Sequence, residues 1–449
     1  MPNLVTTNPA DPDISASDRL WQRSQGLIPG GTQTLAKGPG QYVDGVAPKY
    51  LRRGRGARVW DVDGNEYLDL SMGVGPLVLG YRWPAVDAAI QAQLEEGITF
   101  SLMHPLEVEV AEELSRILPG AESVRFSKTG ADATSAAIRL ARAFTGRSKV
   151  LCAGYHGWHD WYIAVTDRNR GIPEAVQDLT FTFGYNDLDS LDQALDKDVA
   201  AVILEPVTFT EPQGGFLEQL RARCTANGTL LVFDEMWTGF RLALGGAAVH
   251  YGVTPDLATY SKAVANGMPL SVLAGRTDVM ALLEREVFFY TTFGGVALSL
   301  AAALATLHEL QRLRVPARLA EVGARIRDGY NRLAAAHGVE AFTRCIGPAC
   351  RTQVVFDASA GSPLELKSLA QQELIRRGVL WSGTHNVCYA LTDRDADYLI
   401  GAWDEVLAIL ADAVRSGDVR SRLRGEPVEP VFRRTSNFNI KPRQAAGAA

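Results

Sequence analysis

The stretch "VRFSKTGADATSAAIRLAR", residues Val124–Arg142, runs from an apolar strand-like segment through a turn into a helical pattern. Gly130 lets the backbone turn tightly, and the unpaired N–H groups of a helix start suit a phosphate. The same residues also fit an ordinary glycine turn with Asp132 as the helix cap. The apolar positions at helical spacing are Ala133, Ala136, Ala137, Leu140 and Phe144. This stretch predicts a strand, a tight turn and a helix in succession.

The same alternation continues on both sides of this stretch. The other strand-like runs are "KVLCAGY" (149–155), "VAAVILEPV" (199–207) and "TLLVFDEM" (229–236). A helical pattern, "LEQLRARCTANG" (217–228), separates the last two of these runs. Strands that alternate with helices in this way are typical of parallel strands joined by crossover helices. We therefore predict an α/β domain in the middle of the chain.

The two ends of the chain have different patterns. "ARVWDVDGNEYLDL" (57–70) has two alternating runs around an Asp-Gly turn, which predicts a β-hairpin. A long helix is expected over Gly295–Leu313, followed by helical and strand-like runs that indicate a smaller α+β domain. The predicted limits are 1–75 for an N-terminal segment, 76–315 for the large domain and 316–449 for the C-terminal domain and tail.

Composition excludes several classes of protein. The 449 residues include 45 Lys and Arg against 51 Asp and Glu, a net charge of -6 with both signs spread along the chain. This balance favours neither nucleic acid nor an anionic membrane as a partner. No segment is long and apolar enough to span a bilayer, and the polar stretch 1–18 reads as a loose leader rather than a signal peptide. The residues after 438 read as a tail.

The cysteines and histidines do not suggest a metal site. The five cysteines are scattered, and the nearest pair, Cys345 and Cys350, has no second pair at metal-ligand spacing. Reduced thiols in the cytoplasm are therefore expected. His156 and His159 lie near Asp160, but no third ligand follows at a suitable spacing.

Polar groups follow three other predicted strands. Asp234 and Glu235 come directly after the apolar "LLVF", where a carboxylate must be paired or must cap a helix. The rings of "GYHGWHDWY" (154–162) either stack on a flat ligand or form an amphipathic rim. Lys262, in the small-residue stretch "TYSKAVANGMPL" (259–270), is either a lysine that snorkels to water or a reactive amine.

Together these groups meet the needs of a pyridoxal 5'-phosphate site. Such a site needs a lysine for a Schiff base, an acid that keeps the pyridine nitrogen protonated, an aromatic platform and a phosphate cradle. Gly130, Tyr155, Asp234 and Lys262 supply these parts, one after another along the chain. In open α/β sheets ligands bind beyond the carboxyl ends of the strands, where all four residues are expected to lie.

The motifs that carry a family resemblance are "DVDGNEYLDLSMGVGPLVLGY", "RFSKTGADAT", "YHGWHD", "ILEPV", "FDEMWTGFR", "SKAVANGMP" and "TTFGG". With them the chain resembles the class III, fold-type I pyridoxal phosphate enzymes, and among these the glutamate-1-semialdehyde aminomutase-like branch. The resemblance covers most of the chain, from about Ile28 to Ile400. It implies a large domain with a mostly parallel central sheet flanked by helices, and a smaller α+β domain built from the N- and C-terminal segments.

The resemblance also implies roles for single residues. Lys262 would form the internal aldimine and move the proton between the substrate and the cofactor. Asp234 would pair with the pyridine nitrogen. Tyr155 would stack on the ring, His156 would shape the turn that follows, and Glu205 would lie near the ring substituents.

The phosphate contacts implied by the resemblance involve two regions. Gly130 and Ala131 stand where the family has Gly and then Thr or Ser, so two backbone amides remain and one hydroxyl is lost. Thr129 is the candidate replacement for that hydroxyl. Thr292 matches a threonine that reaches the phosphate of the neighbouring subunit's cofactor, which implies a homodimer.

The substrate-binding positions depart from those of the aminomutases. Lys37, with Thr34 before it, stands near the place of a carboxylate-binding arginine, and a lysine lacks the bidentate fork of arginine. Gly383 stands opposite an acidic residue of the mutases. Both departures favour an aminotransferase that moves an amino group from a donor amino acid to a carbonyl acceptor.

Other functions remain open at the level of sequence. An intramolecular aminomutase or an epimerase would use the same lysine. A non-catalytic binding protein on this fold would lack the lysine or the acid, and both Lys262 and Asp234 are present. A dinucleotide-binding protein would need a G-x-G-x-x-G after the first strand of the sheet, and none occurs in that context.

Overall fold

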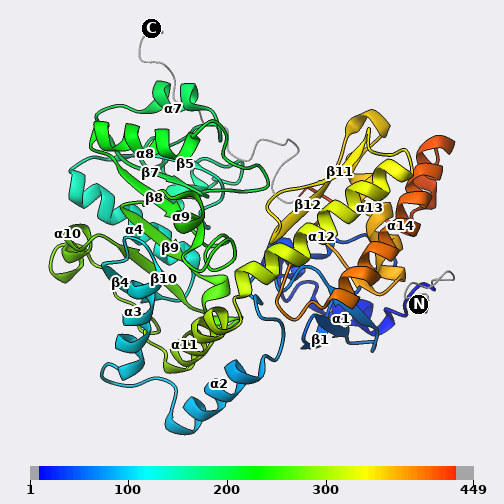
Figure 1. Ribbon diagram of the computed structural model, residues 1–449, viewed down its shortest axis with the longest axis horizontal. Helices are drawn as coiled ribbons and strands as arrows, with labels where there is room; N and C mark the ends of the chain where they lie inside the picture. Colours follow the sequence, from blue (N-terminus) through cyan, green and yellow to red (C-terminus); the bar gives the residue numbers. More distant parts are fainter. Residues whose placement is uncertain (1–9, 431–449) are drawn as a thin grey trace. The chain divides into compact units, whose positions relative to one another are not determined.

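The computed structural model describes residues 10–430 and divides them into two compact units (Figure 1). One unit holds the described residues up to Trp83 and those from Ala317 onward, and the other holds Pro84–Pro316. We call them the outer-segment unit and the central unit. The divisions fall after residues 83 and 316, whereas the limits expected from the sequence were residues 75 and 315; those domain limits stay a prediction.

The central unit alternates strands and helices along most of its length. Its elements are α2 (Pro84–Glu96), α3 (Pro105–Ile117), β4 (Ser123–Ser127), α4 (Gly130–Thr145), β5 (Lys149–Ala153), α5 (Asp160–Ile163), α6 (Glu174–Gln177), β6 (Thr180–Thr182), α7 (Leu188–Ala194), β7 (Val199–Leu204), α8 (Phe216–Asn227), β8 (Leu230–Asp234), α9 (Gly246–Tyr251), β9 (Leu257–Tyr260), a 3-10 turn η4 (Lys262–Ala265), β10 (Ser271–Gly275), α10 (Thr277–Met280) and α11 (Ala297–Arg312).

A seven-stranded sheet forms the middle of the central unit, in the order β4-β10-β9-β8-β7-β5-β6 (Figure 1). The neighbouring pairs from β9 to β6 are parallel, and β10 is antiparallel to both β4 and β9. The strands β7 and β8 are buried along their whole length, as expected for apolar strands covered on both faces. The mostly parallel sheet agrees with the predicted fold class, while the antiparallel strand β10 was not predicted.

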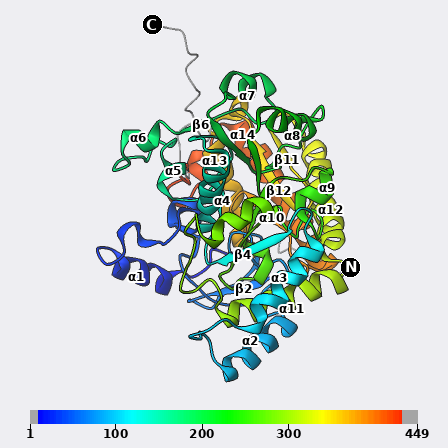
Figure 2. The same ribbon diagram turned by 90° about the vertical axis from the view of Figure 1, so that its left-hand side faces the viewer.

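The helix α4 shows how local sequence sets an element. Thr129 caps its start by accepting a hydrogen bond from the Asp132 N–H, and the Asp132 carboxylate accepts one from the Thr129 N–H in return. Gly146 ends the helix in the left-handed conformation. The alanine-rich face of α4 is buried in the main core of this unit. At another edge of the unit, α2 and α11 lie side by side in both views (Figures 1 and 2).

The outer-segment unit is built from both ends of the described chain. Its elements are α1 (Ser15–Ser24), β1 (Leu51–Arg55), β2 (Arg58–Asp61), β3 (Glu66–Asp69), α12 (Val315–Ala336), β11 (Thr343–Ile346), β12 (Arg351–Phe356), α13 (Pro363–Arg376), β13 (Val379–Leu380), β14 (Thr384–Asn386) and α14 (Asp393–Ser416). The strands form a four-stranded sheet, β1-β2-β3-β13, and a three-stranded antiparallel sheet, β11-β12-β14.

Two expectations about the N-terminal region have different outcomes. The hairpin expected over residues 57–70 is confirmed, because β2 and β3 pair antiparallel, with Val59 opposite Tyr67. The loose leader expected over residues 1–18 is wrong for its last residues, because α1 begins at Ser15. The Asp63 carboxylate accepts the N–H groups of Ala16 and Ser17, which ties this helix start to the hairpin turn. Residues 1–9 and the tail after residue 438 lie outside the described residues.

Among residues 10–430, no helix is both long enough and apolar enough to cross a membrane.

Candidate active site

Two residues of the candidate site, Asp234 and Lys262, lie at the ends of β8 and β9. These strands are parallel neighbours, and Asp234 at the end of β8 lies opposite Thr259 of β9. Lys262 follows three residues later, at the start of η4, with a φ of +47°. A non-glycine residue in this left-handed region is uncommon and is found often at functional positions. The register of two strands thus brings the acid and the lysine predicted from the sequence to the same edge of the sheet.

Asp234 is held by a histidine from another loop. Its Oδ2 accepts a hydrogen bond from His156 Nδ1 at 2.8 Å, and its Oδ1 accepts the Met236 N–H at 3.1 Å. The two side chains are buried, with exposed fractions of 0% for His156 and 1% for Asp234. Because a carboxylate is an acceptor, this bond places a proton on Nδ1. His156 Nε2 is buried and has no hydrogen-bond partner among residues 10–430.

Glu235, the next residue, has a structural role. Its carboxylate accepts the N–H groups of Ala247 and Ala248 at the start of α9, and also the Thr238 hydroxyl. Burial raises the pKa of Glu235 to about 7, against the opposing effect of these hydrogen bonds. Of the two acids that follow the strand, Glu235 is therefore the helix cap and Asp234 is the one turned toward the histidine.

The start of α4 contacts the loops that carry Asp234 and His156. A Cβ placed on Gly130 would lie 2.7 Å from the Met236 sulfur, so Met236 packs directly against the start of α4. Ala131 packs against Gly157, where a Cβ would lie 2.7 Å from the Ala131 Cβ. The first N–H groups of a helix have no partner within the helix, which leaves those of Gly130 and Ala131 available to an anion.

Tyr155 is positioned by Glu205. The Tyr155 N–H donates to Glu205 Oε1 at 2.9 Å, and a Cβ on Gly154 would collide with the same carboxylate. The Tyr155 residue is 41% exposed and packs edge-on against Tyr162, with ring centroids 5.5 Å apart. Burial, together with the nearby charges of Asp234 and Glu205, raises the pKa of the Tyr155 hydroxyl. The exposed part of the ring is a platform of the kind that a flat ligand needs.

Two residues near Lys262 received no role from the sequence. Trp237 is nearly buried, and its ring centroid lies 6.0 Å from Lys262 Nζ. The guanidinium of the fully buried Arg241 lies 4.8 Å from the same ring. The sequence could have pointed to both residues, because in "FDEMWTGFR" a tryptophan and an arginine four residues apart follow an apolar strand. The approach of Trp237 to Lys262 depends on the pairing of β8 with β9.

The remaining predicted site residues lie in three places. Thr129 is the N-cap of α4, and its hydroxyl accepts the Asp132 N–H while keeping its own hydrogen to donate. Thr292 is exposed in the turn before α11. Thr34 and Lys37 are exposed and belong to the outer-segment unit, at the short helical turn Leu35–Lys37.

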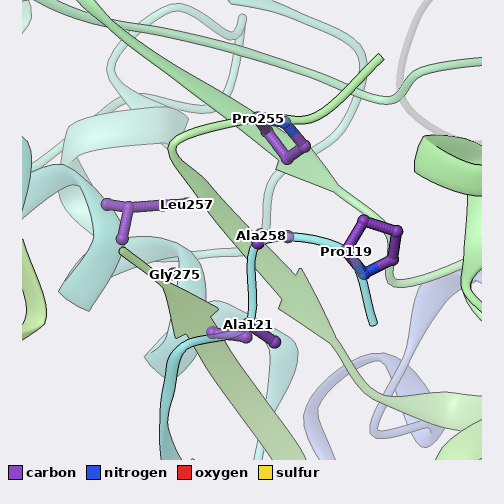
Figure 3. A pocket seen from close by; sticks show the side chains of 8 residues that line it. Pro119, Ala121, Pro255, Leu257, Ala258 and Gly275 are labelled. Carbon is purple, nitrogen blue, oxygen red and sulfur yellow. The ribbon is translucent and has the colours of Figure 1, made fainter. Parts of the chain in front are cut away.

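Other features of the described residues carry little chemistry. Within residues 10–430, no group of three or more His, Cys, Asp or Glu side chains is placed to hold a metal ion. A small recess in the central unit lies between Pro119 and Pro255 and is floored by Ala258 and Gly275 (Figure 3). Its lining residues are apolar and none is titratable, so it has no part in the predicted chemistry.

These residues fit pyridoxal phosphate. The Asp234 carboxylate is buried yet paired with a histidine, as an acid facing a protonated ring nitrogen needs to be. Gly130 lets Met236 pack against the helix start, next to N–H groups suited to a phosphate. Lys262 supplies the amine on an adjacent loop.

Comparison with known proteins identifies the family of the chain. The family model for aminotransferase class III matches residues 43–393, which is most of the chain. The chain is 36% identical over 409 residues to the 3-aminobutyryl-CoA aminotransferase of Cloacimonas acidaminovorans, covering 88% of this chain and 97% of that protein. It is also 36% identical to the glutamate-1-semialdehyde 2,1-aminomutase of Syntrophobacter fumaroxidans, covering 86% of this chain and 96% of that protein.

Solved structures show the same fold. The FumI protein of Sphingopyxis sp. MTA144, in its pyridoxal phosphate internal aldimine form, superposes with a TM-score of 0.83 at 31% identity, over 89% of this chain and 97% of that one. The β-phenylalanine aminotransferase of Variovorax paradoxus superposes with a TM-score of 0.76 at 27% identity, over 87% and 93%. The predicted fold type, enzyme class and cofactor are thereby confirmed, and the chain belongs to the class III aminotransferases, which are pyridoxal phosphate-dependent enzymes.

Proposed function

We propose that the chain moves an amino group from an amino donor to a carbonyl acceptor, with Lys262 and Asp234 as its catalytic residues. The observation that carries this proposal is the contact of the α4 start with both the Met236 and Gly157 positions. It joins a helix start suited to a phosphate to the loops that hold Asp234 and Tyr155. Bound pyridoxal phosphate would supply an electron sink for the pair of electrons left when a substrate C–H bond breaks.

Lys262 is the proton carrier in this proposal. Its Nζ is a base when neutral, and it can take a proton from a substrate carbon and return it to another atom nearby. Trp237 bounds the space on one side of the amine, because its ring lies 6.0 Å from Nζ and is nearly buried. Such a wall restricts the positions of the lysine side chain and keeps bulk water away from it.

Asp234 and His156 act as one unit in this proposal. Asp234 would face the ring nitrogen of the cofactor and hold a proton there. His156 would keep the carboxylate oriented through the 2.8 Å bond from Nδ1. The Thr134 hydroxyl donates to the His156 carbonyl at 2.8 Å and so fixes the histidine backbone to α4.

The phosphate would bind to the N–H groups of Gly130 and Ala131, with the Thr129 hydroxyl as a further donor. Tyr155 would stack on the ring, with Glu205 holding its backbone. Thr34 and Lys37 are the proposed contacts to the substrate. Lys37 offers a positive charge for a carboxylate without the fork of an arginine.

One experiment tests the cofactor and its lysine. Purified protein with pyridoxal phosphate should show a visible absorbance band that borohydride removes, and peptide mapping should then find the cofactor attached to Lys262. The Lys262→Ala variant should bind the cofactor noncovalently and should lose turnover. A protein that takes up no cofactor, or attachment at another lysine, would contradict the proposal.

The relatives do not agree on the outcome of the reaction, since one is named an aminotransferase and another an aminomutase. A panel of amino donors distinguishes the two outcomes. Bleaching of the visible band with release of one equivalent of keto acid or aldehyde supports amino transfer. Product that forms without any free carbonyl compound would instead support a mutase.

We also propose a homodimer in which Thr292 reaches the cofactor phosphate of the neighbouring subunit. The central unit exposes many large apolar side chains in residues 98–108 and 288–293. The chain just after the second segment meets the first segment, because the Ala297 N–H donates to the Ile98 carbonyl and a Cβ on Gly295 would lie 2.7 Å from Glu107 Oε1. The exposed members of the patch are Ile98, Phe100, Leu102, Met103, Val108, Phe288, Tyr290 and Phe293. A patch of this kind marks an interface between proteins.

Mixed dimers test the role of Thr292. The Lys262→Ala and Thr292→Ala variants should each be impaired alone. When they are coexpressed, a mixed dimer regains one site with both an intact Lys262 and an intact Thr292, so activity should recover. No recovery in a purified mixed dimer, or a monomer by light scattering, would rule out the shared site.

A further inference from the structure

Lys128 connects two loops of the candidate site. It directly follows β4 and precedes Thr129, the N-cap of the helix start proposed to hold the phosphate. Its ammonium donates to the Pro269 carbonyl at 3.0 Å and to the Ser299 hydroxyl at 3.2 Å. The hydroxyl of Ser299, which is 1% exposed on α11, donates to the same carbonyl at 2.8 Å. Lys128 thereby joins the turn before α4 to the segment before β10 and to α11.

The segment that Lys128 contacts is itself tied to Lys262. The Ser261 hydroxyl donates to the Leu270 carbonyl at 2.6 Å, which closes the base of the loop that carries Lys262. Ser261 precedes Lys262 in the chain, and Leu270 follows Pro269. A short path of covalent and hydrogen bonds therefore runs from Lys262, through the closed base of its loop, to Lys128.

The pairing of β4 with β10 brings the two loops side by side. These strands are antiparallel, with Ser127 at the end of β4 opposite Ser271 at the start of β10. The chain that leaves β4 for α4 therefore lies beside the chain that enters β10 from the Lys262 loop. Beyond this pair of serines, the Lys128 side chain continues the connection between the two loops.

Another lysine of the central unit has different surroundings. Lys149, at the start of β5, is also partly buried, and it pairs with Asp196 and Asp198 at 3.3 Å each. Lys128 pairs with no carboxylate among residues 10–430 and bonds to neutral oxygens instead. Hydrogen bonds from a charged donor are stronger than those between neutral groups. The contacts of Lys128 therefore suit it to fix the positions of loops.

We propose that Lys128 is a positioning residue of the cofactor site, which sets the spacing between the start of α4 and the amine of Lys262. This role rests on the proposed function, because it takes these two places as the anchors of the cofactor. Pyridoxal phosphate would be held at both anchors at once, so its affinity depends on their spacing as well as on each contact. A ligand held at one anchor alone does not sense the spacing.

The affinities of the full-length apoprotein for three ligands test this role. Lys128→Met should weaken the binding of pyridoxal phosphate roughly 10-fold, because the loops lose a charge-assisted connection. The affinities for pyridoxal, which lacks the phosphate, and for inorganic phosphate should stay within about twofold of those of the wild type. Absorbance titration measures the first two ligands, and competition against pyridoxal phosphate measures the third. Lys128→Arg keeps the charged donors and should retain most of the affinity.

Lys149→Met is the matched control, because it removes a partly buried lysine of the same unit that contacts neither loop. It should leave all three affinities unchanged, and urea unfolding of each apoprotein shows whether the variant is folded. Should Lys128→Met fail to fold, Ser299→Ala removes one of the two acceptors of the ammonium. It should weaken the binding of pyridoxal phosphate by a smaller factor and leave the other two affinities unchanged.

Several outcomes would overturn the role of Lys128. Equal affinity of the wild type and Lys128→Met for pyridoxal phosphate would remove it. An equal loss for phosphate alone, or for pyridoxal alone, would assign Lys128 to one anchor rather than to the spacing. Equal losses for all three ligands would leave only a general support of the fold. If the wild type itself binds no pyridoxal phosphate, the proposed function fails and this role falls with it.

Discussion

Two buried histidines, one in each unit, have opposite surroundings. His156 shares its Nδ1 with the Asp234 carboxylate, and its Nε2 has no partner among residues 10–430. His385 has partners on both nitrogens: Nδ1 lies 2.8 Å from the Thr352 hydroxyl, and Nε2 accepts from Trp403 Nε1 at 3.4 Å. Burial lowers the pKa of His385 to about 3.

The difference separates the histidine that we propose to act in the site from a structural one. His385 is neutral, has both nitrogens engaged and lies in a core of aromatic rings, so it can stabilise the fold without taking part in chemistry. His156 is bound to a carboxyl group, and its other ring nitrogen is buried without a partner among residues 10–430. A pair that is left partly unsatisfied in the interior marks a place where the fold trades stability for function.

The largest effect is expected from Asp234→Asn. Replacing the carboxylate removes the charge proposed to hold a proton on the cofactor, so turnover should fall roughly 10²- to 10³-fold. Single-turnover kinetics and the affinity for pyridoxal phosphate measure the loss. The matched control is Asp256→Asn, a buried acid paired with Arg221 and Arg276 at the other end of β9. That control should lose stability and keep its activity per folded molecule, and equal turnover for both variants would remove the role of Asp234.

His385→Leu is expected to act on stability alone. The substitution leaves the Trp403 N–H buried without a partner and removes the bond to the Thr352 hydroxyl, at a cost of about 2–3 kcal/mol. Urea unfolding measures the loss, and the activity per folded molecule should not change. The control His337→Gln alters a histidine directly after α12 that is bound to Asp404 near the surface, and it should cost less than about 1 kcal/mol. Lost activity with unchanged stability in His385→Leu would reverse the comparison.

A smaller effect on turnover is expected at His156. His156→Leu removes the bond to Asp234 and should lower turnover roughly 10-fold, because the carboxylate loses its orienting donor. His156→Asn can place an amide N–H near the former Nδ1 and should retain most of the activity. The ratio of the two variants, with the absorbance spectrum of each holoenzyme, separates this bond from simple packing. Equal losses in both variants would show that the ring itself matters more than the hydrogen bond.

The smallest net effect is expected from pH between 4.5 and 6.5. The folded pKa of His385 is lowered, so its neutral form favours folding above 6.5 and this stability is lost as the pH falls toward 3. The folded pKa of Glu235 is raised to about 7. Its contribution to the free energy of unfolding is therefore largest below pH 4.5 and is lost as the pH rises to 7. Between pH 4.5 and 6.5 the two groups change the free energy of unfolding in opposite directions. Their combined effect on it should therefore stay within about 1 kcal/mol.

The variants make the two slopes visible. Relative to the wild type, His385→Leu should lose the slope that rises with pH, and Glu235→Gln should lose the slope that falls. Urea unfolding at several pH values measures both differences, from which groups common to all three proteins cancel. If the stability of both variants depended on pH as that of the wild type does, the pKa shifts of His385 and Glu235 would both be contradicted.

Much of the fold was predictable because it depends on neighbours along the chain. The hairpin over 57–70 follows from alternating residues around an Asp-Gly turn, and α4 follows from the reciprocal cap of Thr129 and Asp132. The antiparallel strand β10 was not predictable in the same way. Its residues are as buried as those of the parallel strands, and its direction depends on the path of the chain after η4.

The candidate site, too, was only partly predictable from the sequence. The sequence by itself determined the residue types and their order, from Gly130 to Lys262, because strand ends and helix starts leave local patterns. Only the tertiary structure decided that Asp234 binds a histidine 78 residues away, that Glu235 caps α9, that Trp237 faces Lys262 and that Lys128 bonds to Pro269. The physical reason is that a pattern reports each residue's local surroundings, whereas a contact between distant residues depends on the register and packing of the elements that carry them.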